Sequence, residues 1–339
     1  MKLLVLGGTL FLGRHIVQAA LDRRHDVTLF NRGHTCPALF PDTEKLCGDR
    51  DGDLRALRGR TWDAVIDTCG YVPRLVHASA AVLQDVVGHY TFISSISVYA
   101  DVRHPGVTEA APVRTLADPT TEEVGPQTYG ALKALCEQAV EAVFPGRALL
   151  VRPGLLVGPY DPTGRFTYWI QRVAAGGEVL APGVPERQVQ CIDARDAATW
   201  IVQRVEAGTT GAFNMTGPDT RLSMGAFLEV CRQTLNRAVC FTWIPEAFLL
   251  EHQVRPWTEL PLWVPPQASG LLAIDISKAQ RAGLAFRPLA ETMRETLQWA
   301  TQREPESSAP TRLASGESTQ AGLAPGRETA LLQHWHRQQ

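Results

Sequence analysis

The chain has 339 residues, of which 45% are hydrophobic and 20% are charged, and its formal net charge is −2. This length suffices for one large domain or two with a substantial core, and the composition is that of an ordinary globular protein. The small net charge offers no electrostatic basis for binding nucleic acid or an anionic membrane, so we expect neither as a partner.

The seven cysteines form no Cys-x-x-Cys pair, and their number is odd. We therefore expect reduced thiols in a cytoplasmic protein, not disulfides or a zinc site. The apolar start Met1–Leu12 contains two glycines and leads into Arg14 and His15, which favours a buried first strand over a signal peptide. No apolar run reaches the length of a membrane span.

The first half of the chain alternates short apolar runs with helical patterns, which predicts βαβ units and a parallel sheet. The expected strands are Lys2–Leu6, Val27–Phe30, Glu44–Cys47, Trp62–Asp67, His89–Ile93 and Ala148–Val151. The expected helices between them are Phe11–Arg23, Pro73–Val87 and Gln127–Phe144. Residues 1–152 are thus predicted to form a doubly wound α/β domain that binds a dinucleotide.

The second half is richer in Pro, Gly and Trp, which predicts a smaller substrate-binding lobe over residues 153–300, packed on the carboxyl edge of the sheet. A return segment at about 189–214 is expected to rejoin the main sheet through a strand at Val189–Ile192 and a helix at Asp196–Glu206. Residues 301–325 have the composition of a flexible linker. Residues 326–339 are expected to form a tail with a short helix at Glu328–Trp335.

A glycine-rich segment follows the first expected strand and opens the first expected helix. At this position in a βαβ unit, backbone N–H groups and the positive end of the helix bind a pyrophosphate. We expect the first glycine to allow the tight turn and the last to let helix and strand pack closely, although an ordinary glycine turn is the alternative. The coenzyme-binding residues expected here are Gly7, Thr9, Leu10, Phe11, Leu12 and Gly13.

The residues after the second strand should select the coenzyme, because a carboxylate there binds the ribose hydroxyl of NAD and repels the phosphate of NADP. The chain has Asn31 and Arg32 instead, and an arginine can bind a phosphate with two donors. We therefore favour NADP, with NAD the alternative if Asn31 binds a bare ribose. Asp49 is expected either to accept from the adenine amino group or to be a turn residue. Thr68, Cys69 and Pro153 complete the expected coenzyme site.

Only four of the 33 basic residues are lysines, and one of them, Lys133, lies four residues after Tyr129. On a helix these two side chains share a face, so we expect a proton-transfer site. Tyr129 would exchange the proton of the substrate oxygen, and the positive charge of Lys133 would favour its phenolate. Lys133 would also bind the nicotinamide ribose. Ser95, on a predicted strand running through residues 92–99, would orient the substrate oxygen, although such hydroxyls can simply cap a strand.

Together these residues resemble the extended, atypical branch of the short-chain dehydrogenase/reductase superfamily, the NAD-dependent epimerase/dehydratase family, over about residues 1–300. The resemblance implies a Rossmann sheet, NADP or NAD as cofactor, a catalytic triad of Ser95, Tyr129 and Lys133, and a homodimer in some relatives. It rests on the Tyr-x-x-x-Lys pair and on further landmarks at residues 94–99, 152–154, 158–159, 192–196 and 213–214.

The departures from the family pattern bear on the substrate. Leu10 replaces the middle glycine of the loop, as in a reductase-like subgroup. Ile96 and Ser97 stand where sugar-nucleotide dehydratases carry Asp-Glu, and Gly154 stands where UDP-sugar epimerases carry Asn. Val189 and Cys191 stand where these epimerases carry an arginine and, two residues later, an aromatic residue.

We thus expect an NADP(H)-linked reductase or dehydrogenase acting on a small carbonyl or alcohol. The alternatives are a sugar-nucleotide epimerase with tightly bound NAD, and a non-catalytic dinucleotide- or RNA-binding protein. The second lobe should set specificity through an apolar pocket, unless its aromatic residues are lobe core. The residues considered for that pocket are Tyr160, Arg165, Phe166, Trp169, Trp257 and Trp263.

Overall fold

The computed structural model describes residues 1–302 and 321–339. Its centre is a seven-stranded sheet in the order β11-β6-β5-β4-β1-β2-β3, and every neighbouring pair is parallel. The doubly wound α/β fold expected from the sequence is thereby confirmed. The strands are β1 (Lys2–Leu6), β2 (Asp26–Asn31), β3 (Glu44–Cys47), β4 (Trp62–Asp67), β5 (Val87–Ile93), β6 (Ala148–Pro153) and β11 (Gly211–Met215).

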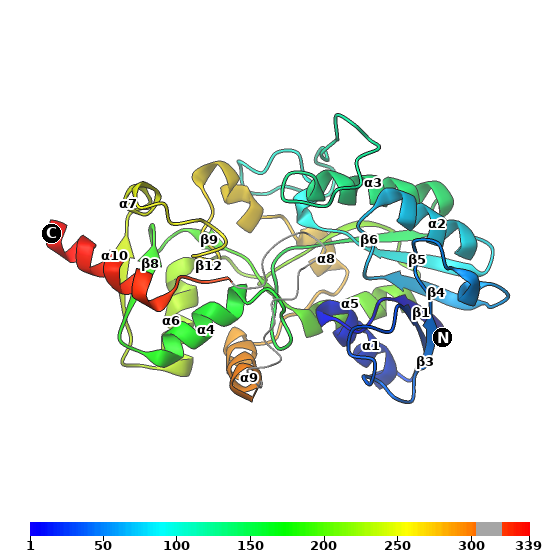
Figure 1. The fold of residues 1–339 in the computed structure, drawn as a ribbon, viewed down its shortest axis with the longest axis horizontal. Coiled ribbons are helices and arrows are strands. Elements are labelled where there is room, and N and C mark those ends of the chain that lie inside the picture. The colour runs from blue at the N-terminus through cyan, green and yellow to red at the C-terminus, as the bar shows by residue number, and fades with distance from the viewer. Residues whose placement is uncertain (303–320) are drawn as a thin grey trace.

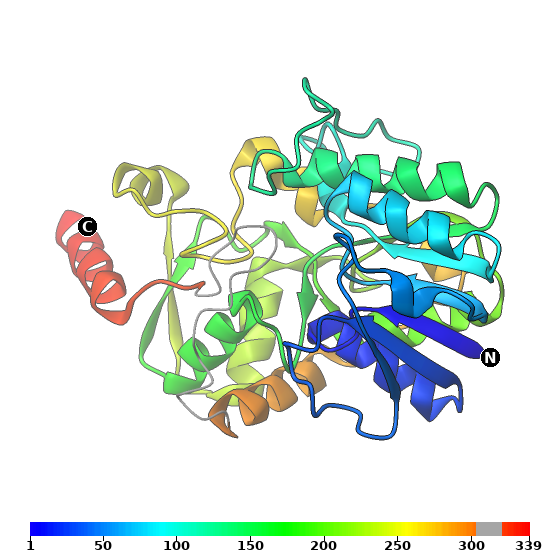
Figure 2. The same cartoon turned by 45° about the vertical axis from the view of Figure 1, so that its right-hand side comes forward.

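Helices cover both faces of this sheet, as Figures 1 and 2 show. Helices α1 (Phe11–Asp22) and α5 (Ala194–Glu206) pack together on one face, and α2 (Pro73–Leu83) and α3 (Tyr129–Val143) pack together on the other. Because both faces are covered, the central strands are nearly all apolar, and Leu3, Leu4 and Val5 of β1 are fully buried.

The order of the strands places a crevice at the carboxyl end of β1 and β4. The chain runs from β1 outward to β2 and β3 on one side, and then returns to β4 and continues to β5 and β6 on the other side. The loops that leave β1 and β4 therefore diverge, and such a switch point is where open α/β sheets bind ligands.

The second lobe lies beside the sheet domain and has its own buried core (Figure 1). Three small two-stranded sheets accompany its helices: β8 (Glu178–Pro182) with β13 (Cys240–Ile244), β9 (Gln188–Val189) with β12 (Leu222–Ser223), and β7 (Leu156–Val157) with β10 (Ile192–Asp193). The helices outside the sheet domain are α4 (Arg165–Ala175), α6 (Met224–Leu235), α7 (Glu246–Glu251), α9 (Leu289–Gln302) and α10 (Pro325–Gln338). The short helix α8 (Ser277–Arg281) packs against β11 of the main sheet. Three short 3₁₀ segments are η1 (Arg55–Leu57), η2 (Ile96–Val98) and η3 (Pro266–Leu272).

The return segment differs from the expectation at its start. Residues 188–193 form β9 and β10, which pair with β12 and β7 and not with the main sheet. Helix α5 and strand β11 do rejoin the sheet domain, because α5 packs on α1 and β11 pairs with β6.

Two further boundaries were predicted wrongly. Helix α2 ends at Leu83 and not at Val87, since Val87 already belongs to β5, where it pairs with Trp62. The predicted strand over residues 92–99 stops at Ile93 and continues as η2.

The ends of the described chain agree with the sequence in part. The predicted terminal helix is present as α10, whereas residues 303–320 of the predicted linker lie outside the described residues. The limits of the two lobes remain predictions. No helix in the described ranges combines the length and apolarity needed to cross a membrane.

Candidate active site

The glycine loop lies directly after β1, at the switch point of the sheet. Gly7 and Gly8 have φ values of +97° and +84°, which disfavour any residue with a side chain. A Cβ on Gly7 would lie 2.5 Å from Thr68 Oγ1, and one on Gly13 would lie 3.1 Å from the backbone of Gly8. The start of α1 is therefore packed closely against β1 and β4, as the sequence predicted for these glycines.

The glycine loop and the start of α1 could hold an anionic group such as a diphosphate. Helix α1 has no side-chain cap at Leu10 and no acidic residue in its first turn, so its amino-terminal N–H groups lack a local side-chain cap. Such groups and the helix dipole attract an anion. Phe11 has a φ of +33°, a strained value for a residue with a side chain, and Leu10 is 44% exposed beside it.

The residues expected to select the coenzyme lie at the end of β2. Asn31 Nδ2 donates to Gly7 O at 3.0 Å, and its Oδ1 accepts from Gly33 N at 2.9 Å, so this amide holds the glycine loop. Arg32 is exposed, and no ion pair involves it within the described residues. Asp49 Oδ1 accepts from Asp51 N at 3.0 Å, as in the turn that was its alternative interpretation.

The floor of the crevice contains a buried ionic cluster that sequence reasoning missed. Arg50 binds both carboxylate oxygens of Asp67, at 3.0 and 2.7 Å, and Tyr90 donates to the same carboxylate at 2.9 Å. The pKa of Asp67 is lowered, because the arginine and these hydrogen bonds outweigh its burial. Nothing in the spacing of residues 50 and 67 indicates this contact, since the turn after β3 creates it.

Two expected coenzyme residues follow β4. Thr68 donates to Leu6 O at 2.8 Å and touches the glycine loop. Burial raises the pKa of the Cys69 thiol to about 11, with nearby Arg50 opposing the rise, so this thiol is neutral near pH 7. Pro153 is buried at the end of β6, where it lies opposite Met215 of β11.

The serine segment forms the first turn after β5. Ser95 is buried and caps η2, accepting from Ser97 N at 3.1 Å, so its hydroxyl proton can still be donated. Ser94 is also buried, and its hydroxyl has no hydrogen-bond partner among the described residues. Ser95 therefore caps the backbone just after β5, as in the alternative interpretation of these hydroxyls. The same hydroxyl can still donate a hydrogen bond to a substrate oxygen.

Tyr129 and Lys133 lie on the first turns of α3, which press directly on the serine segment. A Cβ on Gly130 would lie 2.1 Å from Ser97 O, so a glycine is required where the helix meets this loop. Lys133 is 3% exposed, and its Nζ donates to Gly70 O at 2.7 Å and to Ile93 O at 2.5 Å. The lysine therefore joins the ends of β4 and β5, while Tyr129 is half-buried beside them.

Tyr71 belongs to the same site, although the sequence analysis did not select it. Its ring centroid is 6.5 Å from that of Tyr129 and 5.0 Å from Lys133 Nζ. A single aromatic residue in the loop after β4 carries no local signal of such a role. The fold places it there because β4 and β5 are neighbours in the sheet.

The six residues considered for the pocket of the second lobe lie in three different environments. Phe166, Trp169 and Trp263 are almost fully buried and belong to the lobe core, which was their alternative interpretation. Tyr160 is 37% exposed and carries the guanidinium of Arg14 at 3.5 Å from its ring centroid. In the remaining pair, the guanidinium carbon of Arg165 lies 5.0 Å from the ring centroid of Trp257.

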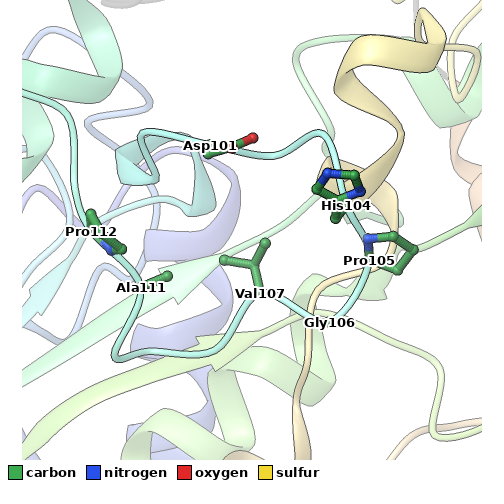
Figure 3. Close-up of a pocket in the computed structure, with 7 residues that line it drawn as sticks. All are labelled: Asp101, His104, Pro105, Gly106, Val107, Ala111 and Pro112. Atoms are coloured by element: carbon green, nitrogen blue, oxygen red, sulfur yellow. The ribbon is translucent and has the colours of Figure 1, made fainter.

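A cavity of about 240 Å³ lies elsewhere, in the segment between η2 and α3 (Figure 3). None of the predicted site residues belongs to its lining. It is open to the surface and is lined by Asp101, His104, Pro105, Gly106, Val107, Ala111 and Pro112. The candidate site is instead the crevice in which the glycine loop, the serine segment, Tyr129 and Lys133 converge.

Comparison with known proteins bears on the family and the fold. Residues 62–215 match the model of the NAD dependent epimerase/dehydratase family. No curated protein matches the chain.

Solved structures with this fold cover most of the chain. A putative epimerase from Burkholderia cenocepacia is 18% identical, with a TM-score of 0.65 over 88% of this chain and 98% of that one. UDP-N-acetylglucosamine 4-epimerase from Bacillus cereus is 16% identical, with a TM-score of 0.66 over 90% and 98% of the two chains. UDP-glucose 4-epimerase from Bifidobacterium longum, in complex with NAD+ and UDP, is 19% identical, with a TM-score of 0.62 over 89% and 99%. At these identities the likeness shows the fold alone.

Proposed function

We propose that this chain, of which residues 62–215 match the model of the NAD dependent epimerase/dehydratase family, is a coenzyme-dependent oxidoreductase of the short-chain dehydrogenase/reductase type. It transfers a hydride between NADP(H) and a small carbonyl or alcohol substrate, and Tyr129 is the acid or base. The observation that carries this proposal is the convergence of Lys133, the first turn of α3 and the serine segment at the carboxyl ends of β4 and β5.

The coenzyme supplies the hydride when it is bound. The glycine loop and the uncapped start of α1 would hold its diphosphate, and Lys133 would lie near the nicotinamide ribose. Ser95 donates its remaining proton to the substrate oxygen and orients it. Tyr129 gives a proton to that oxygen in reduction and removes it in oxidation.

Lys133 provides the charge that this proton transfer needs. A free tyrosine titrates near pH 10, about 3 units above neutral pH, which corresponds to about 4 kcal/mol. A protonated amine on the same helix face stabilises the phenolate, and the low solvent exposure of Lys133 strengthens that interaction. The neutral Cys69 thiol and the carboxylate of Asp67, already paired with Arg50, leave this role to Tyr129.

We keep NADP as the preferred coenzyme because of Arg32. This exposed arginine follows β2, and Asn31 places no negative charge near the expected position of the ribose. The dissociation constants of NADPH and NADH, measured by fluorescence titration, test the preference. We expect NADPH to bind more tightly than NADH. Arg32→Ala should weaken the binding of NADPH about 10-fold or more, with little effect on the binding of NADH. Tighter NADH binding by the unaltered protein contradicts the preference.

Turnover tests the chemistry. With a panel of small carbonyl compounds, the enzyme should consume NADPH, which is followed by its absorbance at 340 nm. Tyr129→Phe should abolish this consumption, and Arg32→Ala should only slow it. Activity that survives Tyr129→Phe unchanged contradicts the proposed acid or base.

A sugar-nucleotide epimerase is the second candidate, favoured by the fold shared with three epimerase structures. Gly154 counts against it: a Cβ there would lie 2.5 Å from Thr216 Oγ1, so the asparagine expected of UDP-sugar epimerases has no room at this position. If a UDP-sugar raises the Tm by several degrees, this second function replaces the first.

A further inference from the structure

Four groups of the protein surround the ammonium of Lys133. Two backbone carbonyls accept hydrogen bonds from it, and two aromatic rings face it, with Nζ 4.4 Å from the ring centroid of Phe92 and 5.0 Å from that of Tyr71. An ammonium has three donors, so one remains for the coenzyme or for the phenol of Tyr129.

No carboxylate within the described ranges forms an ion pair with this ammonium. Burial lowers the pKa of Lys133, and the opposing effects of more distant groups do not restore it. The ionisable groups that interact electrostatically with the ammonium include Asp67 at the end of β4, Cys69 just after it, Cys136 and Glu137 on α3, and Arg50 in the turn after β3. Asp67, Cys136 and Glu137 favour the charged form of Lys133, and Arg50 disfavours it. The groups in direct contact that favour the charge are the two carbonyls and the negative faces of the two rings.

We propose that Tyr71 is a positioning residue whose ring holds the Lys133 ammonium in the crevice beside Tyr129. The inference deepens the proposed function, because it matters for catalysis only if Lys133 supports Tyr129. The interaction itself requires neither coenzyme nor substrate.

Tyr71 can be varied, whereas Phe92 cannot. Phe92 is fully buried in β5, and its ring fills the space against which Gly70 packs, where an added Cβ would lie 2.5 Å away. Tyr71 is half-buried in the loop between β4 and α2, so a change there alters the environment of the lysine with less effect on the core.

The ring of Tyr71, and not its hydroxyl, carries the effect. Burial raises the pKa of this phenol, and the neighbouring Tyr129 raises it further, so Tyr71 is neutral near pH 7 and does not act as a second phenolate. Its oxygen forms no hydrogen bond within the described part of the chain, whereas its ring lies within cation–π distance of Nζ. Tyr71→Phe should therefore preserve the interaction, and Tyr71→Leu should remove it.

The expected effect is a change in the acid dissociation constant of Lys133. A cation–π contact favours the charged amine, so its loss makes the amine easier to deprotonate. From the usual strength of such contacts, we expect the acid dissociation constant to rise about 2- to 5-fold in Tyr71→Leu. In the active enzyme the alkaline limb of the pH profile then moves to lower pH.

The measurement is direct because the chain has only four lysines. The full-length protein is labelled with ¹³C at the lysine ε-carbon, the Lys133 resonance is assigned by its loss in Lys133→Met, and its titration is followed by NMR. Lys278 is the internal reference, since it lies 4.2 Å from the ring centroid of Phe213 and donates to Ala212 O at 2.6 Å, independently of Tyr71.

The inference predicts that Tyr71→Phe titrates as the unaltered protein does, that Tyr71→Leu deprotonates more readily, and that Lys278 is unchanged in both. Tyr71→Met, which retains bulk without a ring, should behave as Tyr71→Leu and replaces it if the leucine variant does not fold. An unchanged or smaller dissociation constant in both ring-free variants overturns the inference, as does a Tyr71→Phe variant that matches them. A failure of NADPH to bind the unaltered protein overturns the proposed function and leaves this titration as it is.

Discussion

A methyl group on Gly130 should disrupt the junction that holds the candidate active site together. Gly130 follows Tyr129 in α3, and its Cα lies against the carbonyl of Ser97 so closely that an added Cβ would be 2.1 Å from that oxygen. The Gly130→Ala variant therefore moves the start of α3 away from the serine segment. Tyr129 moves with it.

The magnitude follows from two opposing effects. Ordinary contact begins at 3.4 Å, so helix and loop must separate by about 1 Å, and the clashing atom is a backbone oxygen that cannot rotate away. Overpacking of this kind costs about 3 kcal/mol, while replacing glycine by alanine in a helix stabilises it by about 1 kcal/mol. The net loss of about 2 kcal/mol should lower the Tm by about 3 °C.

Thermal unfolding of two matched variants tests this reasoning. Gly326 lies in the first turn of α10, and a Cβ there would meet nothing within 4 Å, so Gly326→Ala should leave the Tm unchanged or slightly raised. NADPH affinity of Gly130→Ala should stay near that of the unaltered protein, because the glycine loop is not touched, whereas turnover should fall about 100-fold for a displacement of this size. A Tm for Gly130→Ala equal to that of Gly326→Ala would show that α3 is not pressed on the serine segment.

Two buried carboxylates give further predictions. Asp161 is buried, its Oδ2 has no hydrogen-bond partner among the described residues, and burial raises its pKa to about 6. Since the folded value exceeds the ordinary one, its contribution to stability is present at low pH and is lost as the pH rises through 6. Urea unfolding should therefore show that the unaltered protein loses about 1–2 kcal/mol relative to Asp161→Asn between pH 5 and pH 8, and parallel pH dependences would contradict this. Glu328 of α10 is 3% exposed, binds Arg172 Nε at 2.5 Å and accepts from Leu180 N at 3.0 Å, so Glu328→Gln should cost about 3 kcal/mol and accelerate hydrogen exchange over residues 325–338. The exposed Glu229, paired with Arg232, is the control, and Glu229→Gln should leave exchange in α10 unchanged; equal protection in both variants would mean that Glu328 does not hold the helix.

The parts of the fold that were predicted correctly are those with a strong local pattern. β1, β3 and β4 begin and end at the residues predicted for them, the glycine loop leads from β1 into α1, and Tyr129 and Lys133 both lie on α3. The errors fall where the local pattern is ambiguous. Val87 continues an apolar helical pattern and belongs to β5, and residues 188–193 form strands whose partners lie outside the main sheet.

The amino-acid order by itself determined the doubly wound fold and the identity of the loop, serine and Tyr-Lys segments, because periodicity, glycine placement and i, i+4 spacing act over a few residues. Only the tertiary structure decided which side chains surround them. Arg50 reaches Asp67, Tyr71 reaches Lys133, and Gly130 meets Ser97. These partners are separated by 17 to 62 positions in the chain, and they meet because parallel strands bring their carboxyl ends to one edge, where contact depends on the packing of whole elements and not on sequence spacing.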